Sequence, residues 1–83
     1  MPSADENREA NALPAIRGVE SSSIAAVGYD PTTRRLYLRF VGSGNAYLYL
    51  DVPPAVFDAL MRAESKGGFV NATIKGSYDY RRL

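Results

Sequence analysis

The segment RRLYLRFVGSGNAYLYLDVPPAVFDALMRAES, residues 34–65, decides the fold because its hydrophobic period changes partway along. Apolar and polar side chains alternate along residues 34–40 and again along residues 46–52, the pattern of half-buried β-strands. The intervening glycine-rich residues 41–45 can supply the positive φ angles of a hairpin turn. Two antiparallel strands joined by a hairpin are therefore predicted.

The second half of this segment has the pattern of a helix. Proline cannot continue a central strand but is tolerated in a first helical turn, so Pro53 and Pro54 mark a helix start, with Asp51 as the expected cap. A helix is predicted over about residues 53–64, with one apolar stripe. That stripe consists of Val56, Phe57, Leu60 and Met61.

Glycines and a further alternation organise the C-terminal part of the chain. The glycines at residues 67–68 are expected to end the helix in left-handed geometry. Residues 69–75 can form one or two more helical turns, with Val70 and Ile74 facing inward. Residues 77–82 alternate like a closing strand at a sheet edge.

The N-terminal part of the chain adds one more strand and a leader. Residues 24–29 are β-branched or aromatic in part and precede the turn sequence DPTT, so they predict a first strand. Residues 1–17 carry no sustained apolar stripe and are interpreted as a flexible leader, which leaves residues 18–83 as a single domain. The predicted fold class is α+β: a small antiparallel meander, one main helix, a short second helix and a closing strand.

The composition excludes several function classes. The 83 residues include no Cys and no His, so thiol chemistry and the commonest general base and zinc ligand are unavailable. The carboxylates of Asp51, Asp58 and Glu64 fall on different helix faces or ends, which favours neither a catalytic pair nor a metal cage. We therefore expect no enzyme, no catalytic residue, no metal and no cofactor. Without an apolar run of membrane-spanning length, a cytoplasmic protein with no membrane partner is expected.

Charge is distributed unevenly along the chain. Residues 1–20 hold four acids and two cations, a net −2, whereas residues 21–83 hold eight cations and five acids, a net +3. Four of these cations lie in the last nineteen positions, beside aromatic and glycine residues: Lys66, Lys75, Arg81 and Arg82. Together they are a candidate site for nucleic-acid phosphates, although each lysine alone is better explained as a cation that complements a helix C-terminus. Neutralising about three phosphates would give a salt slope near −2 on single strands.

Two aromatic patterns have competing interpretations. Tyr47 and Tyr49 project from one strand face, where they could stack on bases, but packing against the helix is the favoured alternative for such amphipathic rings. Tyr37 alternates with Arg35 and Arg39, which again suits nucleic acid, yet a solvated outer sheet face explains it more simply.

Four blocks of the chain resemble the KTSC domain family: VESSSIAAVGYD, LYLRF, YLYLDVPPAVFDAL and SKGGFVNATIKGSYDYRRL. The resemblance covers roughly residues 18–83 and includes a central Tyr-x-Tyr, here Tyr47 and Tyr49, and a Ser-Lys-Gly at residues 65–67. The family is a short module found at the C-terminus of some lysyl-tRNA synthetases and as stand-alone bacterial proteins. Val70 stands where the family would place a second aromatic after Phe69.

The resemblance implies RNA or tRNA as a partner, by association with a tRNA synthetase. The predicted function is a non-enzymatic binding module for RNA or another nucleic acid, acting through the four C-terminal cations and the two strand tyrosines. The alternative is a protein-interaction or regulatory module that uses the sheet edge and the helix surface. The sequence leaves the natural ligand and the oligomeric state open.

Overall fold

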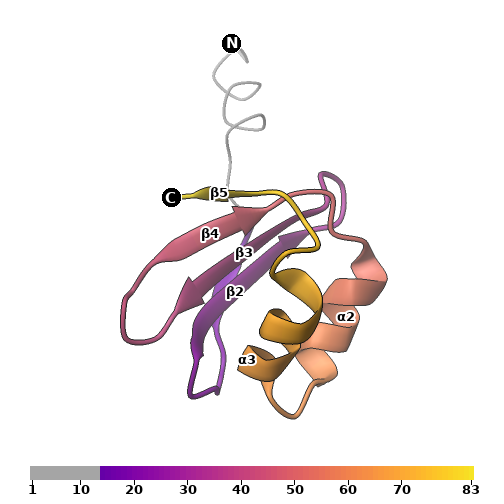
Figure 1. Ribbon diagram of the computed structural model, residues 1–83. Coiled ribbons are helices and arrows are strands. Elements are labelled where there is room, and N and C mark those ends of the chain that lie inside the picture. The colour runs from indigo at the N-terminus through magenta and orange to yellow at the C-terminus, as the bar shows by residue number, and fades with distance from the viewer. Residues whose placement is uncertain (1–13) are drawn as a thin grey trace.

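Residues 14–83, which the computed structural model describes, form an antiparallel sheet with helices on one of its faces (Figure 1). The five strands are hydrogen-bonded in chain order, so every connection joins neighbours. They are β1 (Ile16–Gly18), β2 (Ile24–Asp30), β3 (Arg35–Phe40), β4 (Ala46–Tyr49) and β5 (Tyr80–Arg82). The predicted α+β meander with a closing edge strand is confirmed, with β1 as an additional strand.

The helical layer consists of α2 (Pro54–Arg62), α3 (Lys66–Phe69) and the π-helical turn η1 (Val70–Ile74). The start of the main helix is confirmed, but the predicted cap is wrong: Pro53 is the N-cap residue, and no side chain caps this end. Asp51 instead adopts a φ of 57° at the bend after β4. Because Pro53 and Pro54 have no N–H, the first turn holds fewer amides that a carboxylate could cap.

The prediction for the glycine pair is also wrong. Helix α2 ends at Arg62, and Gly67 and Gly68 lie in the first turn of α3, where the hydroxyl of Ser65 accepts a hydrogen bond from the Gly68 N–H at 3.0 Å. A Cβ atom at Gly67 would lie 2.7 Å from the Cβ of Ser23. Gly67 is therefore a glycine because the start of α3 lies against the loop before β2, whereas a Cβ atom at Gly68 would lie 3.0 Å from the Ser65 hydroxyl oxygen. The predicted left-handed helix end does not form.

The sheet face under the helices holds the main core. Cross-strand partners place Val27, Leu38 and Tyr47 in one row, while Leu36 pairs with Tyr49 in the next. The core on this side includes Ile24, Val27, Leu36, Leu38, Tyr49, Val52, Leu60, Val70 and Ile74. The inward orientation predicted for Val70 and Ile74 is confirmed, since both are fully buried.

The opposite face of the sheet is less polar than predicted. Gly28, Tyr37 and Leu48 are cross-strand partners on this face, and Tyr37 and Leu48 pack with Ala26 in a second small cluster. Tyr37 keeps 8% of its surface exposed, so the expectation of a solvated ring between two arginines is wrong. Neighbouring apolar side chains on the same sheet face cover its ring.

Strand β1 places the start of the sheet before residue 18. Ile16 pairs with Gly28 and Gly18 pairs with Ala26, so the chain folds back onto β2 ahead of the predicted domain boundary. A Cβ atom at Gly28 would lie 2.6 Å from the carbonyl oxygen of Ala15, which explains a glycine inside this strand. The rest of the predicted leader, residues 1–13, lies outside the described residues. Within residues 14–83, no helix is both long and apolar enough to cross a bilayer.

Candidate functional site

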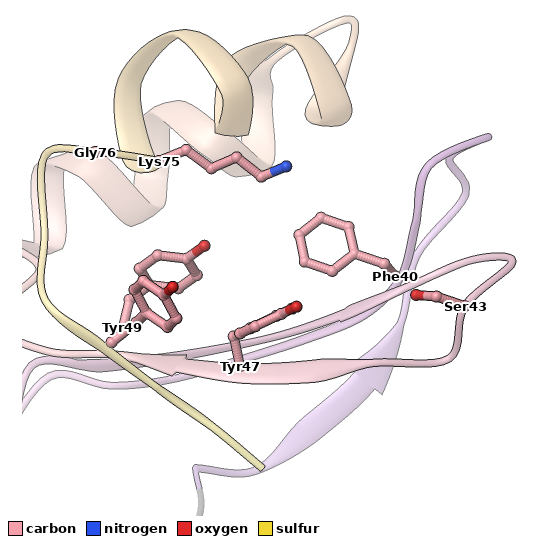
Figure 2. A pocket seen from close by; sticks show the side chains of 7 residues that line it. Phe40, Ser43, Tyr47, Tyr49, Lys75 and Gly76 are labelled. Carbon is pink, nitrogen blue, oxygen red and sulfur yellow. The ribbon is translucent and has the colours of Figure 1, made fainter.

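A cleft of about 400 Å³ lies between the sheet and the chain segment that leaves the helical layer (Figure 2). Strands β3, β4 and β5 and the hairpin between β3 and β4 form its floor and one end, and the turn after η1 lies above them. The lining residues are Phe40, Ser43, Tyr47, Tyr49, Lys75, Gly76 and Tyr80.

Four aromatic rings make the floor of the cleft. Tyr47 and Tyr49 point toward the helical layer from β4, and Tyr80 joins them because it pairs with Tyr49 across β4 and β5. The Tyr47 ring centroid lies 5.6 Å from that of Phe40 and 5.6 Å from that of Tyr80, both edge to face. Tyr49 and Tyr80 are 5.5 Å apart. The floor is therefore one continuous aromatic surface.

Lys75 covers one end of this floor. It ends the helical turn η1 with a ψ of 130°, and Gly76 then reverses the chain at a φ of 81°. The Lys75 ammonium lies 5.3 Å from the centroid of the Phe40 ring, and Figure 2 shows it reaching over the floor from above. A cation over an aromatic face is held at such an exposed site by about 0.5–1 kcal/mol.

The polar groups of the cleft are suited to an anion. The lining side chains supply four hydroxyl groups and one ammonium group, and none is a carboxylate. Burial raises the pKa of Tyr49 above its ordinary value of 10.0, and the neighbouring hydroxyls of Tyr47 and Tyr80 raise it further. The Tyr49 phenol therefore stays protonated near neutral pH. A phenolic hydroxyl in this form can donate a hydrogen bond. Within residues 14–83, no group of three or more acidic side chains could hold a metal ion.

The two strand tyrosines share one sheet face but differ in burial. Tyr49 is 3% exposed and belongs to the main core, as the packing interpretation expects. Tyr47 is only partly buried and packs against the same core, but its ring also lines the cleft. A shared face for both rings follows from strand alternation, and the degree of burial depends on how far the helices extend over them.

The four C-terminal cations are not brought together. Lys75 lines the cleft, and Arg82 pairs with Tyr47 and so lies on the same sheet face. Arg81 pairs with Leu48 and lies on the opposite face. Lys66 donates a hydrogen bond to the carbonyl oxygen of Met61 at 3.4 Å, near the C-terminal end of α2, which agrees with the helix-end interpretation.

Sequence reasoning did not single out four of the cleft residues: Phe40, Ser43, Gly76 and Tyr80. The alternation of residues 77–82 did separate Tyr80 from Arg81, which is the signal that could have placed Tyr80 beside the β4 tyrosines. This alternation places Tyr80 only if it is also known that β5 pairs with β4 and which residues of the two strands are partners. For Phe40 and Ser43 the alternation offers no comparable signal, because the cleft forms only where the turn after η1 passes above them.

Comparison with known proteins relates the chain to one family. Residues 20–78 match the model of the KTSC domain. A protein of Tsukamurella paurometabola is 60% identical over 57 residues, which span 69% of this chain and 84% of that protein. A lysine–tRNA ligase of a Nostoc species is 41% identical over 76 residues, which span 92% of this chain and 13% of the ligase.

The fold is also found in a solved structure. The crystal structure of a KTSC domain protein from Yersinia pestis superposes with a TM-score of 0.77 at 39% sequence identity. The match covers 83% of this chain and 99% of that protein.

Proposed function

This chain belongs to the KTSC domain family, and from that premise we propose that it is a non-enzymatic module that binds single-stranded RNA through the aromatic cleft. The observation that carries the proposal is the meeting of three tyrosine rings and one ammonium group in a cleft whose lining contains no carboxylate. Cytosolic residence and the lack of a membrane partner stay predictions.

The rings provide the contacts that single-stranded nucleic acid uses. Tyr80 keeps 57% of its surface exposed, so its ring has contact area to offer a ligand. Bases stack on exposed aromatic side chains for about 1–3 kcal/mol each, with little dependence on sequence. Tyr49 is buried in the core and contributes by supporting the floor.

The position of the cations limits the proposed phosphate contacts to one face. Lys75 and Arg82 lie on the cleft face, while Arg81 lies on the other and Lys66 is held at the end of α2. Two phosphate contacts on a single strand correspond to a slope of log affinity against log salt of about −1.4. This is shallower than the slope expected if all four cations took part.

The relatives support RNA as the ligand by association. The lysine–tRNA ligase of one Nostoc species contains a segment 41% identical to this chain, and the name of that enzyme includes tRNA. The side chains that line the cleft offer hydroxyl groups and one ammonium group, and the chain contains neither His nor Cys. This set of groups favours binding over catalysis.

The proposal is tested by titrating the protein into a labelled single-stranded RNA of about twelve nucleotides at low salt, long enough for one site. Lys75→Gln and Arg82→Gln are each expected to weaken binding severalfold. Arg81→Gln removes the same charge from the opposite face and is the matched control, with little change expected. Undetectable binding, or an equal loss in the control, would contradict the proposal.

A second candidate function rests on the opposite sheet face. Ile16 is 44% exposed and pairs with Gly28, next to Tyr37 and Leu48, so an apolar row runs across four strands toward Arg81. Such a row suits a protein partner, with the short edge strands β1 and β5 on either side. Recovery of a protein partner after nuclease treatment, lost in an Ile16→Lys variant, would favour this alternative.

A further inference from the structure

The dimensions of the cleft restrict what can enter it. Its volume of about 400 Å³ falls in the lower range of small-ligand sites. The turn at Gly76 lies above the floor and the hairpin at Ser43 lies at one end, so the rings are reached through a bounded opening (Figure 2). Bases inside a duplex have both faces covered by neighbouring pairs and cannot stack on a side chain without leaving the helix.

The tyrosine rings and the ammonium group of the cleft lie at different ends of it. Tyr49 lies at one end, and the Lys75 ammonium extends toward Phe40 at the other (Figure 2). The Tyr80 ring lies beside Tyr49, with the two centroids 5.5 Å apart. The edge-to-face contact between Tyr47 and Tyr80, at an interplanar angle of 76°, forms a corner in the floor. A ligand that combines a flat ring with an anionic group at a short distance matches this separation.

The chain around Lys75 leaves room for the anionic group. A Cβ atom built on Gly76 meets no atom within 4 Å, so the backbone of this turn faces open space. The Lys75 side chain is exposed, and its ammonium lies over the Phe40 ring. Because no carboxylate lines the cleft, a phosphate can bind this ammonium without competing with an acidic side chain. Ammonium groups bind phosphate as point charges, which suits a terminal phosphate.

We infer that the cleft holds one unpaired nucleotide as a unit, with its base against Tyr47 and Tyr80 and its phosphate at Lys75. This inference rests on the proposed function and makes it more specific: the recognised element is a single nucleotide, and the remainder of an RNA strand adds only the contact at Arg82. A free nucleoside monophosphate is therefore sufficient for binding.

The test uses the full chain labelled with ¹⁵N and titrated separately with adenosine monophosphate, adenosine and ribose 5-phosphate at low salt. Adenosine monophosphate is expected to shift the amide signals of Ser43, Gly76 and Tyr80, and to bind at least tenfold more tightly than either fragment. Lys75→Gln and Tyr80→Leu should each weaken its binding at least fivefold. Arg81→Gln, on the other face, should change it less than twofold.

The ligand series on the unmodified chain decides the inference even if a variant misfolds. Equal binding of adenosine shows that the phosphate has no role, and equal binding of ribose 5-phosphate shows that the base has none; either result overturns the inference. If the RNA oligonucleotide binds and adenosine monophosphate does not, the inference fails while the proposed function stands. If the monophosphate binds as expected and RNA does not, the inference holds and the proposed function fails.

Discussion

The ammonium of Lys75 lies 5.3 Å from the centroid of the Phe40 ring, and this contact joins the end of the helical layer to the end of β3. It spans the cleft between two parts of the chain that are distant in sequence. Both residues also line the cleft, so the contact connects its two sides.

Phe40→Leu is expected to remove the interaction between the Lys75 ammonium and the ring at position 40. Leucine retains most of the packing against Tyr47 but has no aromatic face, so the interaction with the ammonium is lost. A double-mutant cycle with Lys75→Gln, measured as the free energy of unfolding in urea, should give a coupling of about 0.5 kcal/mol. Additive effects of the two substitutions would show that the contact contributes nothing.

Tyr29→Phe is expected to destabilise the protein by about 1 kcal/mol, the usual effect of leaving a carbonyl without its hydrogen bond. The Tyr29 hydroxyl donates to the carbonyl oxygen of Val52 at 2.6 Å, while its ring stacks on Phe57 with centroids 4.7 Å apart. The substitution removes the first contact and keeps the second.

Tyr78→Phe is the matched control for this substitution, because the hydroxyl of Tyr78, which is also partly buried, forms no hydrogen bond within residues 14–83. Urea unfolding of both variants measures the difference. Equal stabilities of the two variants would mean that the bond to Val52 does not stabilise the fold.

Gly67→Ala is expected to destabilise the protein by about 1–3 kcal/mol, the range for overpacking at a close contact. The added methyl group would lie 2.7 Å from both the Cβ and the hydroxyl oxygen of Ser23. Removing that side chain in the double variant Gly67→Ala with Ser23→Gly should restore part of the loss, as read from thermal unfolding. A double variant less stable than the sum of the two single changes would show that the cost has another origin.

Stability should fall at alkaline pH, in part because of Tyr49. Burial and the neighbouring phenols raise its pKa above 10.0 in the folded protein, so the folded state holds this proton more tightly than the unfolded chain. The resulting stabilisation is complete below pH 10.0 and is lost as the pH rises through the raised pKa.

Tyr49→Phe removes this contribution and should flatten the decline in melting temperature above about pH 10, the ordinary tyrosine pKa. Because Tyr29 also has a raised pKa, caused mainly by burial, part of the decline should remain in the variant. An unchanged profile in Tyr49→Phe would contradict the assignment to this residue.

Local periodicity alone was enough to predict most of the secondary structure. The alternation along residues 34–40 and 46–52, the prolines at residues 53–54 and the inward positions Val70 and Ile74 correspond to β3, β4, the start of α2 and the buried side of η1. These features depend on residues adjacent in sequence, because strand and helix geometry fix which side chains share a face. Strand β1 has only three residues, too few to show an alternation of apolar and polar side chains, and only its pairing with β2 defines it.

The sequence by itself thus determined strands β2 to β5, the main helix and which residues share a face, since each follows from contacts between near neighbours in the chain. The tertiary structure alone decided which face the helices cover, and with it that Tyr47 borders a cleft while Tyr37 packs on the other side. It also separated Arg81 from Arg82. The physical reason is that these outcomes depend on the register of β5 against β4 and on the path of the chain after η1, which are contacts between segments distant in sequence.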